Sequence, residues 1–407
     1  MMKRYLLASL IVTTACGGAP ADPPVVSDSA GVTIVQNFGP SWARGEEWTL
    51  SEEPLLSIGD STRGEEYAFE RIVGALNLSN GSIVVANGGT QELRWFGADG
   101  TYQTSAGRTG TGGVTFSALQ WIGRYGDEAV LAFDSPHLRT AILSNDGTLL
   151  ESGSLIMTFQ APPGDVRGVF ADSSLLVVRG ARHWVRSMQG EPNAPQGLRR
   201  GPALAFRYAS QDGSFLNPLG SYNGSEQIFR TGRTNIVHVN ARPFGRNAVL
   251  TSFGNNLYVG TQDSYEIRVK SNLDSLVALI RLERDNAPVT QEHIDRYKNG
   301  RLANVHARER EAREARLDSL PWPEAMPAYS VFLVDTEGNL WVQDYRPFGA
   351  EQPTWNVFDP THRMLGTVET PFRLTVLDIG PDYVLGRWRE PSGEESVRMY
   401  ALEKPAG

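Results

Sequence analysis

The segment comprising residues 71–107 constrains the fold of this chain most, because it has the pattern of four short strands joined by three tight turns. Two of the turns contain Asn80-Gly81 and Asp99-Gly100, dipeptides that strongly favour β-hairpins. An isolated four-stranded sheet cannot bury both of its faces, whereas similar sheets packed around a common axis can. The segment therefore predicts an all-β chain that repeats this unit radially, a β-propeller.

The second and third strands of the unit each recur six times along the chain. The second strand is expected at residues 82–87, 128–134, 174–179, 256–261, 339–344 and 383–389, each preceded by a turn. The third strand is expected around residues 95–96, 142–143, 206–208, 267–269, 357–358 and 399–400. Two separate six-fold counts predict a six-bladed β-propeller.

The sixth repeat has no outer strand of its own, since few residues follow its third strand. Residues 56–64 align with residues 104–112, which include the outer strand of the first repeat. We therefore expect residues 54–59 to supply the missing strand, which closes the ring and removes its open edges. Residues 31–36 are expected to add a further strand beside it.

Two insertions interrupt the expected propeller domain, which spans residues 31–407. Residues 185–203 are rich in Pro, Gly and Arg and are expected to form a loop insertion. Residues 235–240 alternate like an additional strand. The second insertion, at residues 288–320, has a different, helical pattern.

In this helical insertion Thr290 is the expected N-cap, and apolar residues follow at helical spacing. Asn299-Gly300 is expected to break or kink the helix. Residues 308–316 mix charges of both signs at spacings of three and four residues, which favours a solvated helix. The insertion is either a lid or partner-docking helix, or a helical decoration on the rim.

Residues 1–16 resemble a bacterial lipoprotein signal peptide. Lys3-Arg4 precedes a short apolar run, and the small residue Ala15 precedes Cys16, the single cysteine of the chain. In that family the cysteine is lipidated, so the resemblance implies an acyl anchor at Cys16 in the lipid bilayer of the cell envelope. Gly17 in place of Asp implies the outer membrane, facing the periplasm or the surface. Thr13 departs from the usual aliphatic residue, and an ordinary secretory signal is the alternative.

The composition indicates a flexible tether and excludes some classes of partner. Residues 17–30 are rich in Pro, Gly and Ala and are expected to form a flexible tether. The net charge of -8 and the isoelectric point near 5.4 argue against nucleic acid as a partner, because phosphate-binding surfaces carry a basic excess. The absence of a second cysteine excludes a disulfide framework.

The repeat itself resembles a known family. Gly81-Ser-Ile-Val-Val, then Trp95-Phe-Gly-Ala-Asp-Gly, and later Glu337-Gly-Asn-Leu-Trp-Val-Gln-Asp are similar to the repeats of six-bladed propellers of the NHL type, including bacterial lipoproteins. The resemblance covers nearly the whole mature chain and implies the fold. It leaves the activity open, because that group includes lyases, lactone hydrolases and plain binding modules.

The sequence lacks the common catalytic signatures. It has no His-Glu-x-x-His, no Gly-x-Ser-x-Gly, no phosphate loop and no Cys/His cluster, so it assigns no catalytic, cofactor or metal residue. The Asp-Gly pairs at residues 99–100, 146–147 and 212–213 lie one per repeat, at turns where Asp is favoured for backbone reasons rather than as calcium ligands.

One face of the expected propeller collects cationic side chains. Loops between repeats and loops after second strands share this face, and no turn type requires Arg there. The residues assigned to this candidate ligand mouth are Arg108, Arg167, Arg242, Arg246, Arg346, Arg373, His137 and His183. Converging guanidinium groups favour an anionic ligand through bidentate hydrogen bonds. The alternative is that these arginines form salt bridges with Glu65, Glu66, Glu324 or Glu390.

The sequence thus favours an envelope-anchored propeller that acts as a binding or scaffold module for a small, anionic ligand or a protein partner, without assignable catalysis. The alternative is a metal-dependent enzyme of the lactonase or lyase type, which would hold calcium or zinc at the central channel. A third hypothesis is an assembly lipoprotein that docks partners through its helical insertion.

Overall fold

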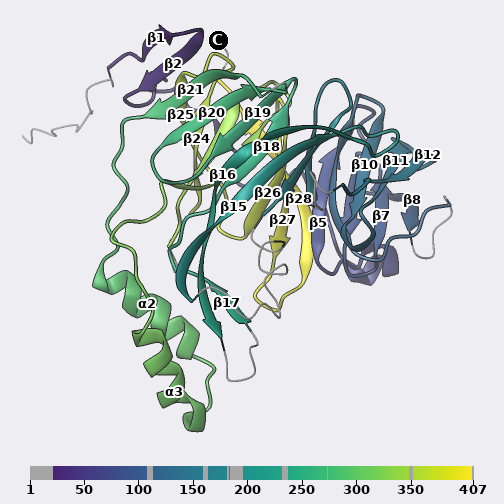
Figure 1. Cartoon of the computed structure of the whole chain (residues 1–407). Coiled ribbons are helices and arrows are strands. Elements are labelled where there is room, and N and C mark those ends of the chain that lie inside the picture. Colours follow the sequence, from purple (N-terminus) through teal and green to yellow (C-terminus); the bar gives the residue numbers. More distant parts are fainter. Residues whose placement is uncertain are drawn as a thin grey trace, which may run out of the picture.

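The structure is a computed structural model that describes residues 22–107, 113–158, 164–180, 183, 196–231, 237–272, 274–347 and 352–405. These residues are mostly β and form many small sheets that stand beside one another, an arrangement consistent with a propeller (Figure 1). None of the helices in these ranges is long and apolar enough to cross a membrane.

The described strands belong to six sheets of four to six strands. The first sheet contains β5 (Ile72–Asn77), β6 (Ile83–Asn87), β7 (Glu92–Phe96) and β8 (Tyr102–Gly107). The second contains β9 (Leu119–Tyr125), β10 (Ala129–Asp134), β11 (Arg139–Ser144) and β12 (Leu149–Ser154). The third contains β13 (Asp165–Val169), β14 (Leu175–Arg179), β15 (Gly197–Tyr208), β16 (Phe215–Thr231) and β17 (Val237–Ala241).

The fourth sheet contains β18 (Val249–Phe253), β19 (Asn256–Gly260), β20 (Glu266–Ser271) and β21 (Leu276–Leu282), to which β2 (Val32–Asn37) and β1 (Val25–Ser29) are added. The fifth contains β22 (Tyr329–Val334), β23 (Leu340–Asp344), β24 (Thr354–Phe358) and β25 (Met364–Glu369). The sixth contains β26 (Leu374–Ile379), β27 (Tyr383–Arg389) and β28 (Glu395–Glu403), with β3 (Thr49–Leu50) and β4 (Leu56–Ile58) beside β28. The helices are the 3-10 turns η1 (Ser61–Arg63), η2 (Glu65–Tyr67) and η3 (Ser135–His137), and α2 (Gln291–Leu302) and α3 (Ala307–Asp318).

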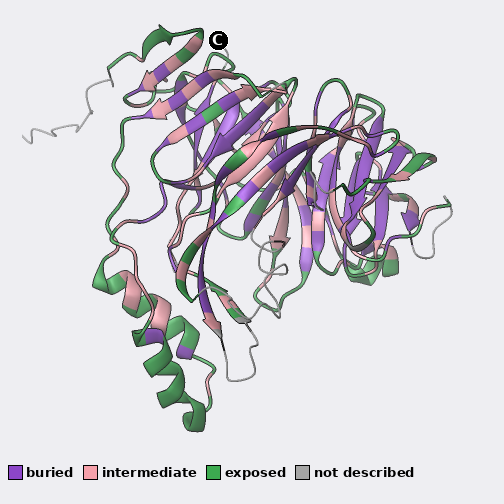
Figure 2. Ribbon diagram, in the orientation of Figure 1, coloured by how far each residue is buried: buried purple, intermediate pink, exposed green. Residues whose placement is uncertain are grey.

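The six predicted second strands and six predicted third strands are all present, and the two pair with each other within each sheet. Every residue of β6 and of β10 is buried, because neighbouring sheets cover both faces of these strands (Figure 2). Gly81 and Gly100 adopt positive φ angles of 81° and 76°, which explains why glycine is needed in these hairpin turns.

The N-terminal segment connects three sheets. Within residues 54–59, β4 pairs with β28, placing Ile58 opposite Val397, which confirms the predicted partner. The predicted position of residues 31–36 is wrong: β2 pairs in parallel with β21, with Val35 opposite Ile280, and not beside β4. Between them, the backbone N–H of Trp42 donates to Leu365 O at 2.8 Å. Alternation identifies a strand in a sequence, but it does not identify the edge with which the strand pairs.

Two further boundaries differ from expectation. The predicted tether, residues 17–30, includes β1, which pairs with β2 although all of its residues are exposed. In the predicted loop insertion, residues 185–195 lie outside the described residues, but residues 197–203 belong to the long strand β15. Its partner β16 extends equally far, so each strand supplies the other's backbone hydrogen bonds. The additional strand expected at residues 235–240 is β17, which pairs with β16.

The helical insertion forms two helices. Thr290 caps α2 as predicted: its Oγ1 accepts a hydrogen bond from the His293 backbone N–H. Asn299-Gly300 does not break this helix, which continues to Leu302. An interior Gly costs about 1 kcal/mol relative to Ala, and burial of the 3 % exposed Leu302 side chain can offset that amount. The break lies at residues 303–306 instead.

Candidate functional site

A cavity of about 410 Å³ lies where four neighbouring strands begin. Gln120, Asp165, Val249 and Ser330 stand at or near the first residues of β9, β13, β18 and β22 and line its wall. Each of these strands lies at one edge of its own sheet, and β13 contacts both β9 and β18, which contacts β22. The volume is within the range of small-molecule sites, about 300–1,000 Å³.

The charged residues of the cavity come from β13 and the turn after β14. Asp165 and Arg167 are two residues apart on one strand, so they share a face, while Val166 between them is fully buried. Arg167 Nη2 is 3.6 Å from Asp165 Oδ2, and the Arg167 side chain is 54 % exposed. His183 Nε2 is 3.9 Å from Asp165 Oδ1, to which Ser135 Oγ also donates at 3.3 Å.

The remaining wall mixes neutral polar and apolar groups. Gln120, Ser225, Asn247 and Ser330 provide hydrogen-bonding side chains, and Val178, Ala203, Ala248, Val249, Leu250 and Val331 provide apolar surface. A small organic molecule can therefore be oriented by a few polar contacts while its body contacts aliphatic side chains. Neutral polar residues at strand starts have no sequence signature, and sequence reasoning missed all of them.

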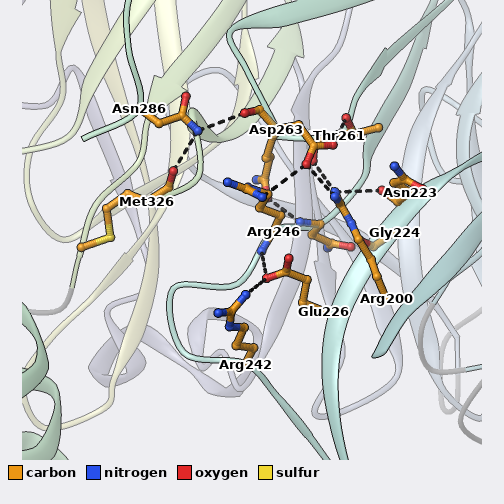
Figure 3. Close-up of polar contacts among 12 residues, drawn as sticks. Arg200, Asn223, Gly224, Glu226, Arg242, Arg246, Thr261, Asp263, Asn286 and Met326 are labelled. Carbon is orange, nitrogen blue, oxygen red and sulfur yellow. Dashed lines mark hydrogen bonds and ion pairs between the residues drawn. The ribbon is translucent and has the colours of Figure 1, made fainter. Parts of the chain in front are cut away.

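Next to the cavity-lining residue Gly224, whose carbonyl accepts a hydrogen bond from Arg200 Nε at 2.9 Å, lies an ion cluster of three arginines and two carboxylates (Figure 3). Arg242 Nη1 is 3.1 Å from Glu226 Oε2, which also accepts the Arg246 backbone N–H. Asp263 Oδ1 is 2.6 Å from Arg200 Nη1 and 3.6 Å from Arg246 Nη1. These five side chains carry one excess positive charge.

The arginines of this cluster also control the ionisation of Asp263. Burial favours the neutral form of the carboxyl, but hydrogen bonds from Arg200 and Thr261 and the charges of Arg200 and Arg246 outweigh it. The pKa of Asp263 therefore lies below its usual value.

The other members of the predicted mouth do not line this cavity. Arg373 pairs with Glu390 at 2.7 Å, one of the salt-bridge partners considered from the sequence. Arg346 lies over the Phe372 ring, 5.1 Å from its centroid, and burial lowers the pKa of its guanidinium. His137 is exposed at the end of η3. Arg108 and Cys16 lie outside the described residues. Arg167 and His183 are thus the two predicted residues that the structure brings together at the cavity.

A second cavity of about 420 Å³ lies at the opposite ends of β5, β9 and β18. There Arg124 makes two hydrogen bonds to Asp378, of 2.7 and 2.6 Å, and Tyr383 donates to the same carboxylate at 2.9 Å. Burial and the Asp378 charge raise the pKa of Tyr383, which keeps its hydroxyl protonated as a donor. This network joins three sheets and is internally satisfied, so it has a structural role.

Among the described residues, no group of three or more His, Cys, Asp or Glu side chains is placed to hold a metal ion. No family model and no curated protein matches the chain.

Solved structures resemble it at low identity. An exported protein from Bacteroides fragilis is 13% identical with a TM-score of 0.48, covering 92% of this chain and 100% of its own. A member of the DUF4221 family from Bacteroides vulgatus is 10% identical with a TM-score of 0.46, covering 89% and 100%. Virginiamycin B lyase from Staphylococcus aureus is 10% identical with a TM-score of 0.39, covering 87% and 99%. At these values the likenesses assign no function.

Proposed function

We propose that this protein is an envelope-anchored, six-bladed β-propeller that binds a small anionic organic molecule in the cavity between β9, β13, β18 and β22. The observation that carries the proposal is the exposure of the Arg167 side chain and its lack of a close carboxylate partner among the described residues. Its side chain is 54 % exposed at the cavity wall, and the nearest carboxylate oxygen among the described residues is 3.6 Å away, beyond normal hydrogen-bond distance. Its donors can therefore bind a ligand carboxylate or phosphate in a bidentate manner.

The surroundings of Arg167 suit such a ligand. Asp165, with contacts to Arg167, Ser135 and His183, restrains the guanidinium beside the cavity. The cluster in Figure 3 carries one excess positive charge and contacts the cavity-lining residue Gly224 through Arg200, so its charge favours an anion in the cavity.

The propeller architecture is proposed from the sheet order. Each of the six sheets contains one predicted second strand and one predicted third strand at its centre. Pairing of β3 and β4 with β28 joins an N-terminal segment to the sixth sheet, as ring closure requires.

The envelope location is proposed from Cys16. If the thiol is lipidated, the full chain will fractionate with membranes and incorporate labelled palmitate. Cys16→Ser is expected to abolish labelling and release the protein in soluble form. Unlabelled wild-type protein in the soluble fraction would contradict the anchor.

The ligand proposal is tested by thermal unfolding of the detergent-solubilised full chain against matched anionic and neutral sugars and acids. A ligand at 100 times its dissociation constant adds about 2.7 kcal/mol to the free energy of unfolding. We expect an anion-specific rise in the melting temperature that Arg167→Gln removes. The control Arg44→Gln changes an exposed arginine whose side chain has no hydrogen bond or ion pair with another described residue, and it should retain the rise.

Equal effects of neutral and anionic compounds, or an unchanged response of Arg167→Gln, would refute the proposal. A rise with calcium or zinc in place of the anions would instead favour the metal-dependent lactonase or lyase. If no small molecule acts, a protein partner would be favoured.

A further inference from the structure

The helical hairpin α2–α3 lies beside the ends of the long strand β16 and of the short strand β17 (Figure 1). Phe244, Tyr297 and Trp322 form an aromatic cluster with ring centroids 5.6–5.8 Å apart, and Phe244 is 6 % exposed. Leu302 and Leu317 are buried, and Lys298 Nζ pairs with Asp318 at 2.7 Å across the two helices. These contacts fix the hairpin in place.

Between the hairpin and the strands lies a cavity of about 250 Å³, here called the arginine pocket, whose lining includes Arg230, Arg301, Arg313 and Arg316. Arg230 comes from β16, Arg301 from α2, and Arg313 and Arg316 from α3, so three elements direct guanidinium groups to one place. Among the described residues that line the pocket there is no Asp or Glu.

In the part of the chain that the structure describes, none of the four pocket arginines has a hydrogen bond or ion pair with a carboxylate. Arg230 Nη2 donates to Ser319 Oγ at 3.3 Å, and Arg301 Nε donates to Tyr297 OH at 3.2 Å. Arg313 and Arg316 have no side-chain hydrogen bond or ion pair with any described residue. This contrasts with Arg124, Arg200 and Arg242, each of which has a carboxylate partner.

Four like charges around one cavity repel one another, so an anion that enters the pocket relieves this repulsion as well as forming hydrogen bonds. A phosphoryl group matches the arrangement because its terminal oxygens, three in a monoester and two in a diester, can accept hydrogen bonds from several planar guanidinium donors at once. The Tyr297 ring and the side chains of Ile228 and Leu317 add apolar surface for an attached organic group.

We propose that the arginine pocket binds the phosphoryl group of a phosphate monoester or diester. The group could belong to a soluble metabolite or to a phospholipid headgroup. Figure 1 places the hairpin at the opposite end of the molecule from β1, where the chain arrives from the proposed anchor, and this favours the soluble source. The site is separate from the cavity at Arg167.

Binding is measured by titration calorimetry on the detergent-solubilised full chain, with inorganic phosphate and glycerol 1-phosphate as probes. Vesicles of phosphatidylglycerol, compared with phosphatidylcholine, form the second arm. The double variant Arg313→Gln/Arg316→Gln is expected to weaken binding at least tenfold. Arg308→Gln, on the same helix but outside the pocket lining, and Arg167→Gln, in the other cavity, should bind within twofold of wild type.

Because Arg313 and Arg316 are both exposed, the double variant should keep the helical content and melting temperature of the wild type. Binding of the free phosphate ester supports a soluble ligand, and binding that requires phosphatidylglycerol vesicles supports a headgroup. Absence of binding in both arms, or equal binding by the double variant and wild type, would overturn the proposal.

Discussion

In three sheets, a polar side chain at or just after the end of the second strand accepts backbone N–H groups that lie just before the first strand of the same sheet. Asp134 ends β10 and accepts hydrogen bonds from the backbone N–H groups of Ser117 and Ala118, at 2.8 and 3.0 Å, just before β9. Asn87 at the end of β6 and Gln262 after β19 accept the N–H groups of Glu70 and Asn247 in the same way. The three residues differ chemically, but each accepts a backbone N–H at the equivalent place in its own sheet.

Asp134 supplies a pH-dependent part of the stability. Burial alone would raise its pKa, but hydrogen bonds from Arg139, Ser117 and Ala118 outweigh burial and lower it below the ordinary 3.8. Its contribution to the free energy of unfolding is therefore complete above pH 3.8 and is lost as the pH falls through the lowered folded-state pKa.

We predict that Asp134→Asn lowers the free energy of unfolding at pH 7 by about 1–3 kcal/mol, because Arg139 and the N–H groups of Ser117 and Ala118 lose a charged acceptor. Denaturant titrations at several pH values measure this. The difference between variant and wild type should begin to shrink as the pH falls below 3.8 and should disappear only below the lowered folded-state pKa, where the wild-type carboxylate is protonated. A difference independent of pH would contradict the assigned role.

At the candidate site, the sequence placed Arg167 and His183 on one face, and both line the cavity at β13; their role in binding stays a prediction. The sequence could not identify the carboxylates that pair with the other arginines. Glu226 lies on β16 and Asp263 follows β19, so these carboxylates come from two different sheets and meet Arg242 and Arg246, which lie between β17 and β18. Strand periodicity does not indicate which side chains from different sheets form ion pairs.

At the scale of elements, β2 depends on one buried amide. Asn37, 1 % exposed, donates from Nδ2 to Arg281 O and His362 O at 3.0 and 3.1 Å and accepts the Met364 N–H at 2.8 Å. It therefore joins β2 to β21 and to the turn before β25.

We predict that Asn37→Ala lowers the free energy of unfolding by about 2 kcal/mol, because it leaves the buried Met364 N–H and the facing carbonyls without partners. Hydrogen exchange should accelerate in β1, β2 and residues 362–364 more than in β5–β8. Gln36→Ala, at the neighbouring position on the outer face of β2, is the control and should change stability little. Uniform acceleration over all sheets would argue against a local role.

The elements that could be predicted were those with a local pattern. Strands with hairpin turns and a helix with a Thr N-cap satisfy much of their own bonding, so short-range sequence determines them. The partner of β2 and the end of α2 depend on distant packing, at Ile280 and around Leu302, and therefore required the structure.

At the scale of the whole molecule, residues 30–60 link the fourth, fifth and sixth sheets. β2 pairs with β21, Trp42 bonds to Leu365, and β3 and β4 pair with β28. Trp42, Trp48 and Trp341 stack in series, with centroids 5.2 and 6.0 Å apart, and add apolar contact along the same path.

Deletion of residues 30–60 is expected to abolish cooperative unfolding, since it opens the sixth sheet and removes the fully buried Ile58. Calorimetry and near-ultraviolet circular dichroism measure the loss. Deletion of residues 22–29, which removes only the exposed β1, is the matched control and should shift the melting temperature by a few degrees at most. A cooperative transition at the wild-type temperature after the longer deletion would refute ring closure.

The pairing of β4 with β28 also sets the order of events during biosynthesis. Ser57 meets Arg398 across this pair, so β4 leaves the ribosome roughly 340 residues before its partner exists, on the order of 20–70 s at about 5–20 residues per second. During that interval the nascent chain carries an open strand edge that can pair with other chains. We therefore expect chaperones that hold unfolded chains to bind the segment around β4 until β28 has been synthesised.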